Sequence, residues 1–229
     1  MNEYFYYGGL PEILSFKNKR AMLSSLYQKI YLGDICARNN IKNDRVMNIL
    51  IKKMAESVKQ PLSFNRLRNV IVSTGSALSV PTTIDYAGYA ADSWLILPME
   101  NEVGKLTEKE MQKKYYFIDN GLLNLFIMNP ETSLLENMVA VELFRRYGKE
   151  NVYYLNADKE IDFIVPDEKL AIQVSYSITE ETTYNREVPP LVKYAKAHED
   201  WKCLLITYDE EDTKDGILVV PVWKWLTEE

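Results

Sequence analysis

Residues 160–177 read EIDFIVPDEKLAIQVSYS, and this stretch decides the expected fold of the C-terminal half of the chain. It contains two apolar runs, 161–165 and 170–176, with the turn-forming residues PDEK between them. The second run is apolar at nearly every position, which is typical of a central strand covered on both faces. In the first run, alternation points Asp162 away from its apolar neighbours. We therefore predict two strands that carry Asp162 and, eleven positions later, Gln173 as polar side chains.

The segments around this stretch predict helices and further strands. A helix over 134–147 has an apolar stripe, which includes Leu135 and Val139, directed toward a sheet. A later helix is expected over 191–197, with Pro189-Pro190 interrupting it on its N-terminal side. Strands are predicted over 152–155, 161–165, 170–176, 202–207 and 217–220. The order helix, three strands, helix, strand (αβββαβ) predicts an α/β sandwich.

Three residues of this half, Glu136, Asp162 and Gln173, are placed like the metal-binding residues of PD-(D/E)XK nucleases, and the region resembles that fold. The resemblance implies a site for Mg²⁺ or Mn²⁺ on these three side chains. Such a nuclease also keeps a lysine two residues beyond the third position, where this chain has Ser175. A metal-dependent phosphodiesterase needs oxygen ligands around the metal and a cation that polarises the attacking water. Because an amide brings no charge and serine no cation, we expect the catalytic site to be degenerate.

Two other interpretations of these residues stay open. Asp162, Gln173 and Ser175 would also form a hydrogen-bonded polar cluster that the fold has inherited. Alternatively, Arg186 or Lys193 on the following helix would supply the missing cation and leave a weak metal-dependent endonuclease of DNA or RNA.

The half before residue 131 begins with a series of helices. Apolar stripes predict one helix over 21–32 and another after Asn43, whose side chain is suited to cap the first turn. Ser63 and Ser79 are expected to cap the next two helices, which the turn 73–76 separates. This spacing predicts a helix-turn-helix.

A hairpin is predicted after these helices, with strands over 94–97 and 115–118 around a charged excursion, 100–114. Helices followed by such a β-wing are typical of a winged helix-turn-helix domain. The second helix of the turn would enter the major groove of DNA. Here that helix, 79–92, contains no Lys or Arg and would neutralise no phosphate. Its polar side chains are Thr82, Thr83, Asp85, Tyr86 and Tyr89.

Contact with protein is therefore the favoured interpretation of the winged helix. The alternative is DNA binding, which would have to use basic residues elsewhere in this half. Those residues are Lys52 and Lys53, Arg66 and Arg68, and Lys113 and Lys114.

Charge is distributed unevenly along the chain, whose formal net charge is −6. Residues 21–130 hold 13 Lys and Arg against 10 Asp and Glu, whereas residues 131–229 hold 11 against 21. Proteins that bind nucleic acid normally present clustered cations to the phosphates. The nuclease-like half therefore has the wrong overall sign for that role.

Several kinds of site are not supported by the sequence. Cys36 and Cys203 lie far apart, so neither a disulfide framework nor a thiolate zinc site is expected. His198 is the single histidine, which argues against Ser-His-Asp and Cys-His catalysis. The sequence around Gly104 does not match a P-loop, and the acidic run 209–215 lacks the ligand pattern of an EF-hand. We expect that run to form a solvated hairpin turn.

No apolar stretch approaches the roughly 18 residues that a membrane helix needs. The N-terminus also lacks the basic start and apolar run of a secretory signal. We therefore expect a cytoplasmic protein with no membrane partner.

Several blocks of the sequence together resemble the C-terminal region of prokaryotic AAA-type ATPases, in which a domain of unknown function follows the nucleotide-binding module. Members of that family are described as an ATPase module, a winged helix and a degenerate or active PD-(D/E)XK-like domain. The resemblance covers nearly the whole chain and rests on the order and spacing of the blocks. They are YGGLPE (7–12), IYLGDI (30–35), PLSF (61–64), YFIDNGL (116–122), LEN (135–137) and EIDF (160–163).

The resemblance implies three parts: residues 1–20 as the end of the ATPase module, 21–130 as the winged-helix domain and 131–229 as the nuclease-like domain. It also implies that this chain lacks the ATPase module and does not hydrolyse ATP by itself. We therefore expect a non-catalytic regulatory or protein-interaction region, whose partner is another protein or the ATPase module.

Overall fold

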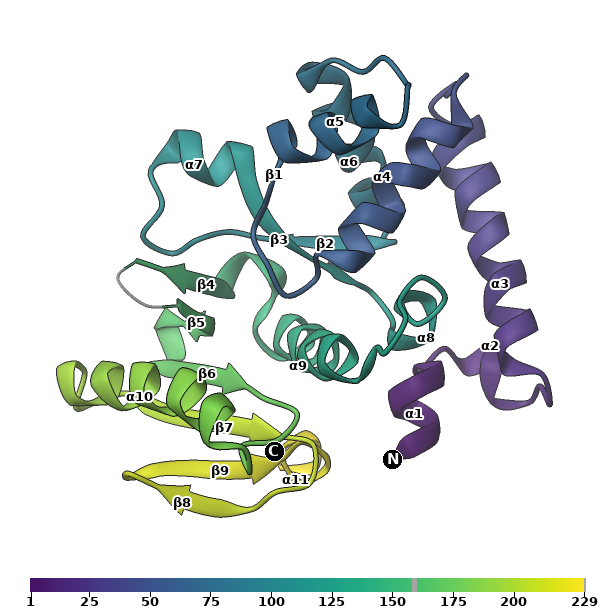
Figure 1. Ribbon diagram of the computed structural model, residues 1–229. Helices are drawn as coiled ribbons and strands as arrows, with labels where there is room; N and C mark the ends of the chain where they lie inside the picture. Colours follow the sequence, from purple (N-terminus) through teal and green to yellow (C-terminus); the bar gives the residue numbers. More distant parts are fainter. Residues whose placement is uncertain (158–159, 229) are drawn as a thin grey trace. The chain divides into compact units, whose positions relative to one another are not determined.

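The structure is a computed structural model that describes residues 1–157 and 160–228. It is a mixed α+β protein with helices and two β-sheets (Figure 1). The chain divides into two compact units. The helical unit comprises Asn2–Pro98 and Glu110–Pro130, and the sheet unit comprises Met1, Met99–Lys109 and Glu131–Glu229. The predicted three-part division of the chain stays a prediction.

The first half of the chain contains short helices and a small sheet. Its elements are α1 (Asn2–Tyr7), α2 (Pro11–Leu14), α3 (Lys19–Lys29), the π-helix η1 (Ile30–Ala37), α4 (Asp44–Glu56), β1 (Leu62–Ser63), α5 (Phe64–Ser73), α6 (Val80–Asp92), β2 (Ile96–Met99), α7 (Leu106–Met111), β3 (Gln112–Phe117) and α8 (Asn120–Leu123).

The three predicted helix caps of this half are confirmed. The side chains of Asn43, Ser63 and Ser79 each accept a hydrogen bond from the backbone N–H three residues later, which begins α4, α5 and α6. These three helices pack on one another through buried side chains that include Leu50 and Leu67. The predicted helix over 21–32 begins earlier, in α3, and continues into η1.

A strand was expected to begin at Trp94, and this prediction is wrong. Trp94 has a left-handed backbone with φ 59° and belongs to the C-terminal end of α6. Its N–H donates to the carbonyl of Ala91, and the N–H of Leu95 donates to the carbonyl of Ala90. These two donors therefore satisfy carbonyl groups of the last turn of α6. The strand β2 begins two residues later and joins a three-stranded sheet in the order β1-β3-β2.

The aromatic N-terminal segment packs against α8. Phe5 of α1 is buried, and its carbonyl accepts a hydrogen bond of 3.0 Å from the Asn120 side chain. Gly9 donates its N–H to the carboxylate of Asp119 at 2.8 Å, while Gly121 and Leu122 donate to the same carboxylate. Asp119 therefore ties the N-terminal segment to the start of α8.

The second half of the chain forms a layered α/β structure. Its elements are α9 (Glu131–Tyr147), η2 (Lys149–Asn151), β4 (Tyr153–Asn156), β5 (Glu160–Val165), η3 (Pro166–Glu168), β6 (Leu170–Val174), α10 (Glu181–Ala197), β7 (Lys202–Thr207), β8 (Asp212–Lys214), β9 (Ile217–Pro221) and α11 (Val222–Thr227).

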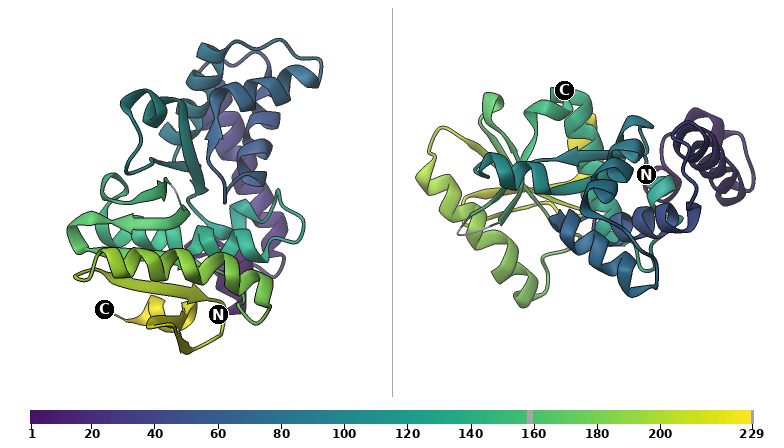
Figure 2. Two further views of the ribbon diagram at one scale, coloured as in Figure 1. Left: turned by 60° about the vertical axis from the view of Figure 1, so that its left-hand side comes forward. Right: turned by 90° about the horizontal axis from the view of Figure 1, so that it is seen from above.

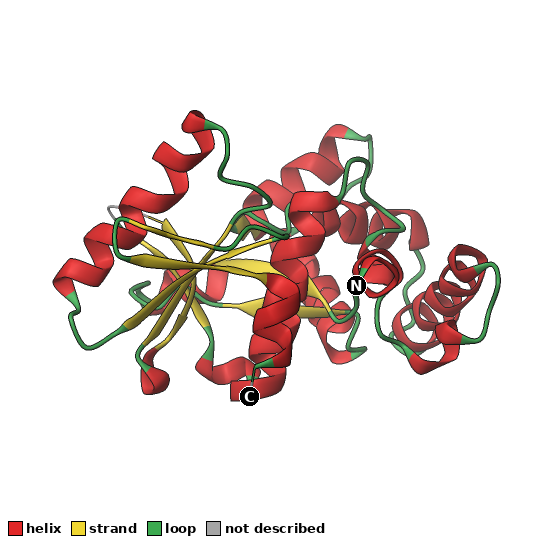
Figure 3. Ribbon diagram, turned by 90° about the horizontal axis from the view of Figure 1, so that it is seen from below, coloured by secondary structure: helices red, strands yellow, loops and turns green. Residues whose placement is uncertain are grey.

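Its six strands have the order β4-β5-β6-β7-β9-β8, with β6, β7 and β9 parallel and the other pairs antiparallel. Helix α10 crosses one face, as the left view of Figure 2 shows. Its Val188 and Leu191 pack with Ala171, Leu205 and Val219 of the strands. Helices α9 and α11 also pack on this sheet, and Figure 3 shows helices on both sides of its strands.

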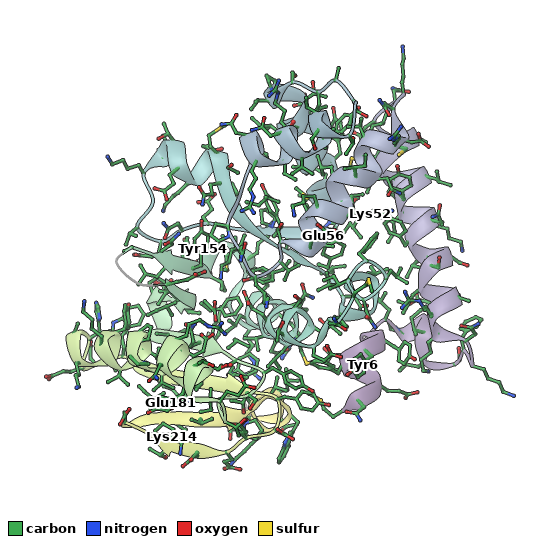
Figure 4. The ribbon with its side chains drawn as sticks, in the orientation of Figure 1. Tyr6, Lys52, Glu56, Tyr154, Glu181 and Lys214 are labelled. Carbon is green, nitrogen blue, oxygen red and sulfur yellow. The ribbon has the colours of Figure 1, made fainter. Side chains whose placement is uncertain are left out.

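Helix α10 runs through Pro189 and Pro190, so the expected interruption is wrong. The two prolines remove two intrahelical N–H donors. The helix continues because Val188 and Leu191, on either side of them, are buried against the sheet. Packing therefore overrides the local preference of the prolines. The helix begins at Glu181, which is labelled in Figure 4 and lies ten residues before the predicted start.

The acidic run 209–215 was expected to be a hairpin turn, and it also contains a strand. β8 pairs antiparallel with β9, from Lys214 opposite Ile217. Asp215 and Gly216 between them have φ 49° and 83°, which suits the twist of a two-residue hairpin. Among the residues that the structure describes, no helix is long and apolar enough to span a bilayer.

Candidate functional site

Strands β5 and β6 bring Asp162 and Gln173 together. The antiparallel register pairs Phe163 with Ile172, so the next pair along the ladder is Asp162 with Gln173. Gln173 has the same parity as Ala171, whose side chain packs with α10. Both polar side chains are buried, with 7% and 6% of their surface exposed. The two predicted residues therefore lie side by side on the α10 face of the sheet.

One oxygen atom of each of these two side chains accepts a backbone hydrogen bond. Oδ2 of Asp162 accepts the backbone N–H of Val174 at 3.0 Å. Oε1 of Gln173 accepts the backbone N–H of Asp162 at 3.3 Å. Each side chain thus accepts a hydrogen bond from the backbone of the other strand. Together they extend the ladder between β5 and β6 past its last regular pair.

Glu187 of α10 completes this cluster, and sequence reasoning missed it. Its Oε2 accepts a hydrogen bond of 2.6 Å from Nε2 of Gln173, and 8% of the residue is exposed. Glu187 lies four residues before the buried Leu191, which is the spacing of one helix face. That signal was available, but the predicted helix began only after the prolines, at residue 191, and so left Glu187 out. We call Asp162, Gln173 and Glu187 the buried polar cluster.

Ser175, at the position of the missing lysine, bonds the backbone of Ser177 and Ile206. Its hydroxyl donates to the carbonyl of Ser177 at 2.9 Å, and its N–H bonds the carbonyl of Ile206 at 3.0 Å. The serine is buried, with 7% exposed. These bonds hold the chain that follows β6, and the grouping of Ser175 with Asp162 and Gln173 stays a prediction.

The two cations considered as substitutes have different positions. The guanidinium of Arg186 donates to Oε1 of Glu187 at 2.7 Å, and 73% of its side chain is exposed. Lys193 instead lines an apolar cavity of about 170 Å³ together with Tyr194 and His198. Arg186 thus borders the buried polar cluster, whereas Lys193 belongs to another part of α10.

Glu136 is buried on α9 with 4% of its surface exposed. Within residues 1–157 and 160–228, no three His, Cys, Asp or Glu side chains gather closely enough to hold a metal ion. Glu136, Asp162 and Glu187 therefore do not surround one point. The proposed set of Glu136, Asp162 and Gln173 would offer a cation two carboxylates and one amide oxygen that already accepts a backbone N–H.

Another acidic residue of α9, Glu142, forms an ion-pair network. Burial acts to raise the pKa of Glu142, but hydrogen bonds from Arg145 and Arg146 hold this pKa below its ordinary value. Arg145 donates to both carboxylate oxygens at 2.8 and 2.6 Å. Arg146 also bonds the carbonyl of Trp225 in α11 and lies 4.7 Å from its ring. This network fastens α11 to α9.

The buried polar cluster is suited to joining elements. It links β5, β6 and α10 through side chains whose donors and acceptors bond one another or the backbone. Buried polar groups that are satisfied in this way contribute to a unique arrangement of the core. The arrangement offers a structural cross-link and, at its border, one exposed guanidinium.

Comparison with known proteins places the chain among proteins that are themselves uncharacterised. A family model described as "Domain of unknown function (DUF8612)" matches residues 1–133. The chain is 30% identical to "Uncharacterized protein MJ1544" of Methanocaldococcus jannaschii, in an alignment covering 98% of this chain and 55% of the relative. It is also 30% identical to an "Uncharacterized protein" of Haemophilus influenzae, over 98% and 57% of the two chains. The chain thus spans about half the length of these relatives, and no solved structure matches it.

Proposed function

Because this chain belongs to the family of the domain of unknown function DUF8612, and two of its nuclease-like residues, Asp162 and Gln173, bond the backbone of each other's strand, we propose that it is a non-catalytic protein-interaction or regulatory region of a prokaryotic AAA-type ATPase. In this proposal the sheet unit is a degenerate PD-(D/E)XK-like domain. The helical unit is a winged helix that contacts protein.

The observation that carries the proposal is the hydrogen bonding of Gln173. Its amide oxygen accepts the N–H of Asp162 and its amide nitrogen donates to Glu187. This oxygen brings no charge and already accepts one hydrogen bond, so it would be a weak ligand for a metal ion. The missing lysine and the excess of acidic residues after residue 130 also support a loss of nuclease chemistry.

The winged-helix part of the proposal is supported by the order of elements and of strands. α4, β1, α5, α6, β2 and β3 follow one another, and β3 lies between β1 and β2. A contact with protein is supported by the state of the basic residues. Lys53 pairs with Glu56, Arg68 bonds the carbonyl of Leu78, and Lys114 is buried.

Lys52 is the exposed member of its pair, and it projects from α4 one turn before Glu56, as labelled in Figure 4. An acidic neighbour at this spacing offsets part of its charge.

The link to an ATPase rests on the ordered sequence blocks described above. The relatives provide room for a further module, because the aligned region makes up 55% and 57% of their lengths.

Calorimetric titration with Mn²⁺, followed by cleavage assays on single- and double-stranded DNA and on RNA, tests the proposal. We expect neither specific Mn²⁺ binding nor cleavage by the wild type. Asp162→Asn retains an acceptor for Val174 but removes the charge, and Asp167→Asn changes an exposed carboxylate nearby in sequence. Cleavage that Asp162→Asn abolishes and Asp167→Asn preserves would overturn the proposal.

A second candidate, a weak metal-dependent nuclease, is favoured by one contact. The guanidinium of Arg186 reaches the buried polar cluster through Glu187 and would stand in for the absent lysine. This candidate predicts metal-dependent cleavage that Arg186→Ala removes and that Lys193→Ala, on the same helix, leaves intact. Equal activity of both variants and the wild type would exclude Arg186 from this role.

A further inference from the structure

A cavity of about 450 Å³ lies among α4, α5 and α6 of the helical unit, three helices that pack on one another. Its volume is within the range of sites that bind small molecules. Most of the residues that line it are polar, and none of those that the structure describes is acidic. The polar lining residues are Asn43, Arg68, Ser79, Thr82 and Tyr86.

The guanidinium of Arg68 is the charged group of this cavity. Its Nε donates to the carbonyl of Leu78 at 3.0 Å, which holds the side chain against the turn between α5 and α6. Its Nη1 donates to Oδ1 of Asn69 at 3.1 Å. Among residues 1–157 and 160–228, Arg68 makes these two bonds and no ion pair. A guanidinium has five N–H donors in a planar fork, so three donors remain for a ligand, on a group whose position the backbone fixes.

Hydroxyl groups of α6 line the same cavity. Thr82 and Tyr86 are four residues apart, so they lie on one face of the helix. The hydroxyl of Thr82 bonds that of Ser79 at 2.8 Å. Burial raises the pKa of Tyr86, with smaller contributions from Tyr89 and Cys36, so the phenol stays protonated and can donate a hydrogen bond. Hydroxyl donors beside a guanidinium are suited to the oxygen atoms of an anion.

The starts of two helices add to the positive potential. Asn43 and Ser79, which cap the 13-residue helices α4 and α6, both line the cavity. A helix N-terminus carries a partial positive charge that favours an anion. The nearest acids in sequence, Asp44 and Asp85, are exposed, and solvent and salt screen their charges. The cavity therefore combines one full positive charge with two partial ones.

We propose that this cavity binds the phosphate group of a small phosphate monoester. Arg68 supplies the ionic contact and paired N–H donors, and Tyr86 supplies a further donor. A single phosphate group is favoured over duplex DNA, because Arg68 is the one cation among the described lining residues and a duplex needs several cations along its backbone. The inference goes beyond the proposed function and does not depend on it.

Calorimetric titration of the full chain with phenyl phosphate tests the inference. Benzenesulfonate is the matched probe, since it has the same ring and carries one negative charge where phenyl phosphate carries two at about pH 8. At constant ionic strength, we expect phenyl phosphate to bind at least about tenfold more tightly, because the positive potential of the cavity favours the dianion. Inorganic phosphate should compete with phenyl phosphate, since the phosphate group itself is recognised.

Variants locate the site. Arg68→Met removes the guanidinium but keeps an unbranched side chain, and it should weaken binding of phenyl phosphate at least about tenfold. Tyr86→Phe removes one hydroxyl, leaves the bond from Arg68 to Leu78 intact, and should weaken binding about fivefold. Arg66→Met is the matched control. It changes an exposed guanidinium of the same helix that is not among the lining residues, and affinity should stay unchanged.

Four results would overturn the inference. They are no binding of phenyl phosphate, equal binding of benzenesulfonate, equal affinity of Arg68→Met and the wild type, and displacement of phenyl phosphate by duplex DNA at lower concentration than by inorganic phosphate. Circular dichroism and thermal unfolding establish that each variant is folded. The proposed function is decided separately, by Mn²⁺ binding and cleavage at Asp162.

Discussion

The carboxylate of Asp119 occupies the space that a Cβ on Gly8 would take. Gly8 has φ 76°, and the next residue, Gly9, donates its N–H to that carboxylate. Burial raises the pKa of Asp119, while hydrogen bonds from the N–H groups of Gly9, Leu122 and Gly121 act in the opposite direction. Both glycines of the N-terminal block thus contact one buried acidic side chain more than a hundred residues away in sequence: Gly8 leaves space for it, and Gly9 donates a hydrogen bond to it.

Gly8→Ala should destabilise the protein more than Gly75→Ala. Both glycines have a left-handed backbone, with φ 76° and 84°, but an added Cβ at Gly75 meets no atom within 4 Å. We expect about 1 kcal/mol for Gly75→Ala from backbone strain alone and about 3 kcal/mol for Gly8→Ala. Urea unfolding of the two variants measures the difference in the free energy of unfolding. Equal losses would show that crowding against Asp119 adds no cost to Gly8→Ala.

Gln173→Ala should reduce the free energy of unfolding by about 2 kcal/mol, because it leaves the N–H of Asp162 and the carboxylate of Glu187 without this partner. Glu187→Gln keeps an acceptor for Gln173 and should cost less than about 1 kcal/mol. Chemical denaturation gives both values. The double variant Gln173→Ala/Glu187→Ala should lose less than the sum of the two alanine variants, and strict additivity would argue against a joined cluster.

Glu142 should make the sheet unit sensitive to acid. Its pKa in the folded protein lies below the ordinary value of 4.5, so the folded state binds its proton less readily than the unfolded state. The resulting stability is complete above pH 4.5 and is lost as pH falls from there through the lowered pKa of the folded state.

Glu142→Gln should therefore be less stable than the wild type near neutral pH, and the difference should shrink as pH falls below about 4.5. Unfolding free energies across that pH range provide the measurement. Glu168→Gln, which changes an exposed acid after β5, serves as the control and should follow the wild type. A difference that grows on acidification would contradict the assigned network.

Pro189→Ala should stabilise the protein by about 1–3 kcal/mol. Pro189 is exposed inside α10, and alanine restores a donor for the carbonyl of Asn185 without disturbing the buried face. Pro11→Ala is the matched control, because Pro11 stands in the first turn of α2, where proline is tolerated. Thermal unfolding should show a higher midpoint for Pro189→Ala only.

Local signals were sufficient for most of the secondary structure. The caps at Asn43, Ser63 and Ser79 each act on a backbone group three residues away, so they can be read without knowledge of the fold. The strands around Asp162 and Gln173 were also predicted, since burial on both faces leaves a continuous apolar run. The same pattern placed these two residues on neighbouring strands.

Local signals failed where a residue's neighbours in space decide its conformation. Trp94 is of a residue type that favours strands, yet it lies at the C-terminal end of α6. The reason is that N–H groups after the helix bond the carbonyls of its last turn. Pro189 and Pro190 have the local preference to end a helix, yet burial of Val188 and Leu191 maintains α10 through them. Because α10 continues through the prolines, Glu187 belongs to this helix and lies within hydrogen-bonding distance of Gln173.

The sequence by itself determined that the chain is a mixed α+β protein, where its capped helices begin, and that a lysine is absent at Ser175. These features depend on the identity of single residues and on short-range periodicity. Packing of the folded chain brings Glu187 to Gln173 and the Gly8-Gly9 turn to Asp119. Such pairings bring together residues far apart in the chain, and their free energy exists only once the strands and helices have packed.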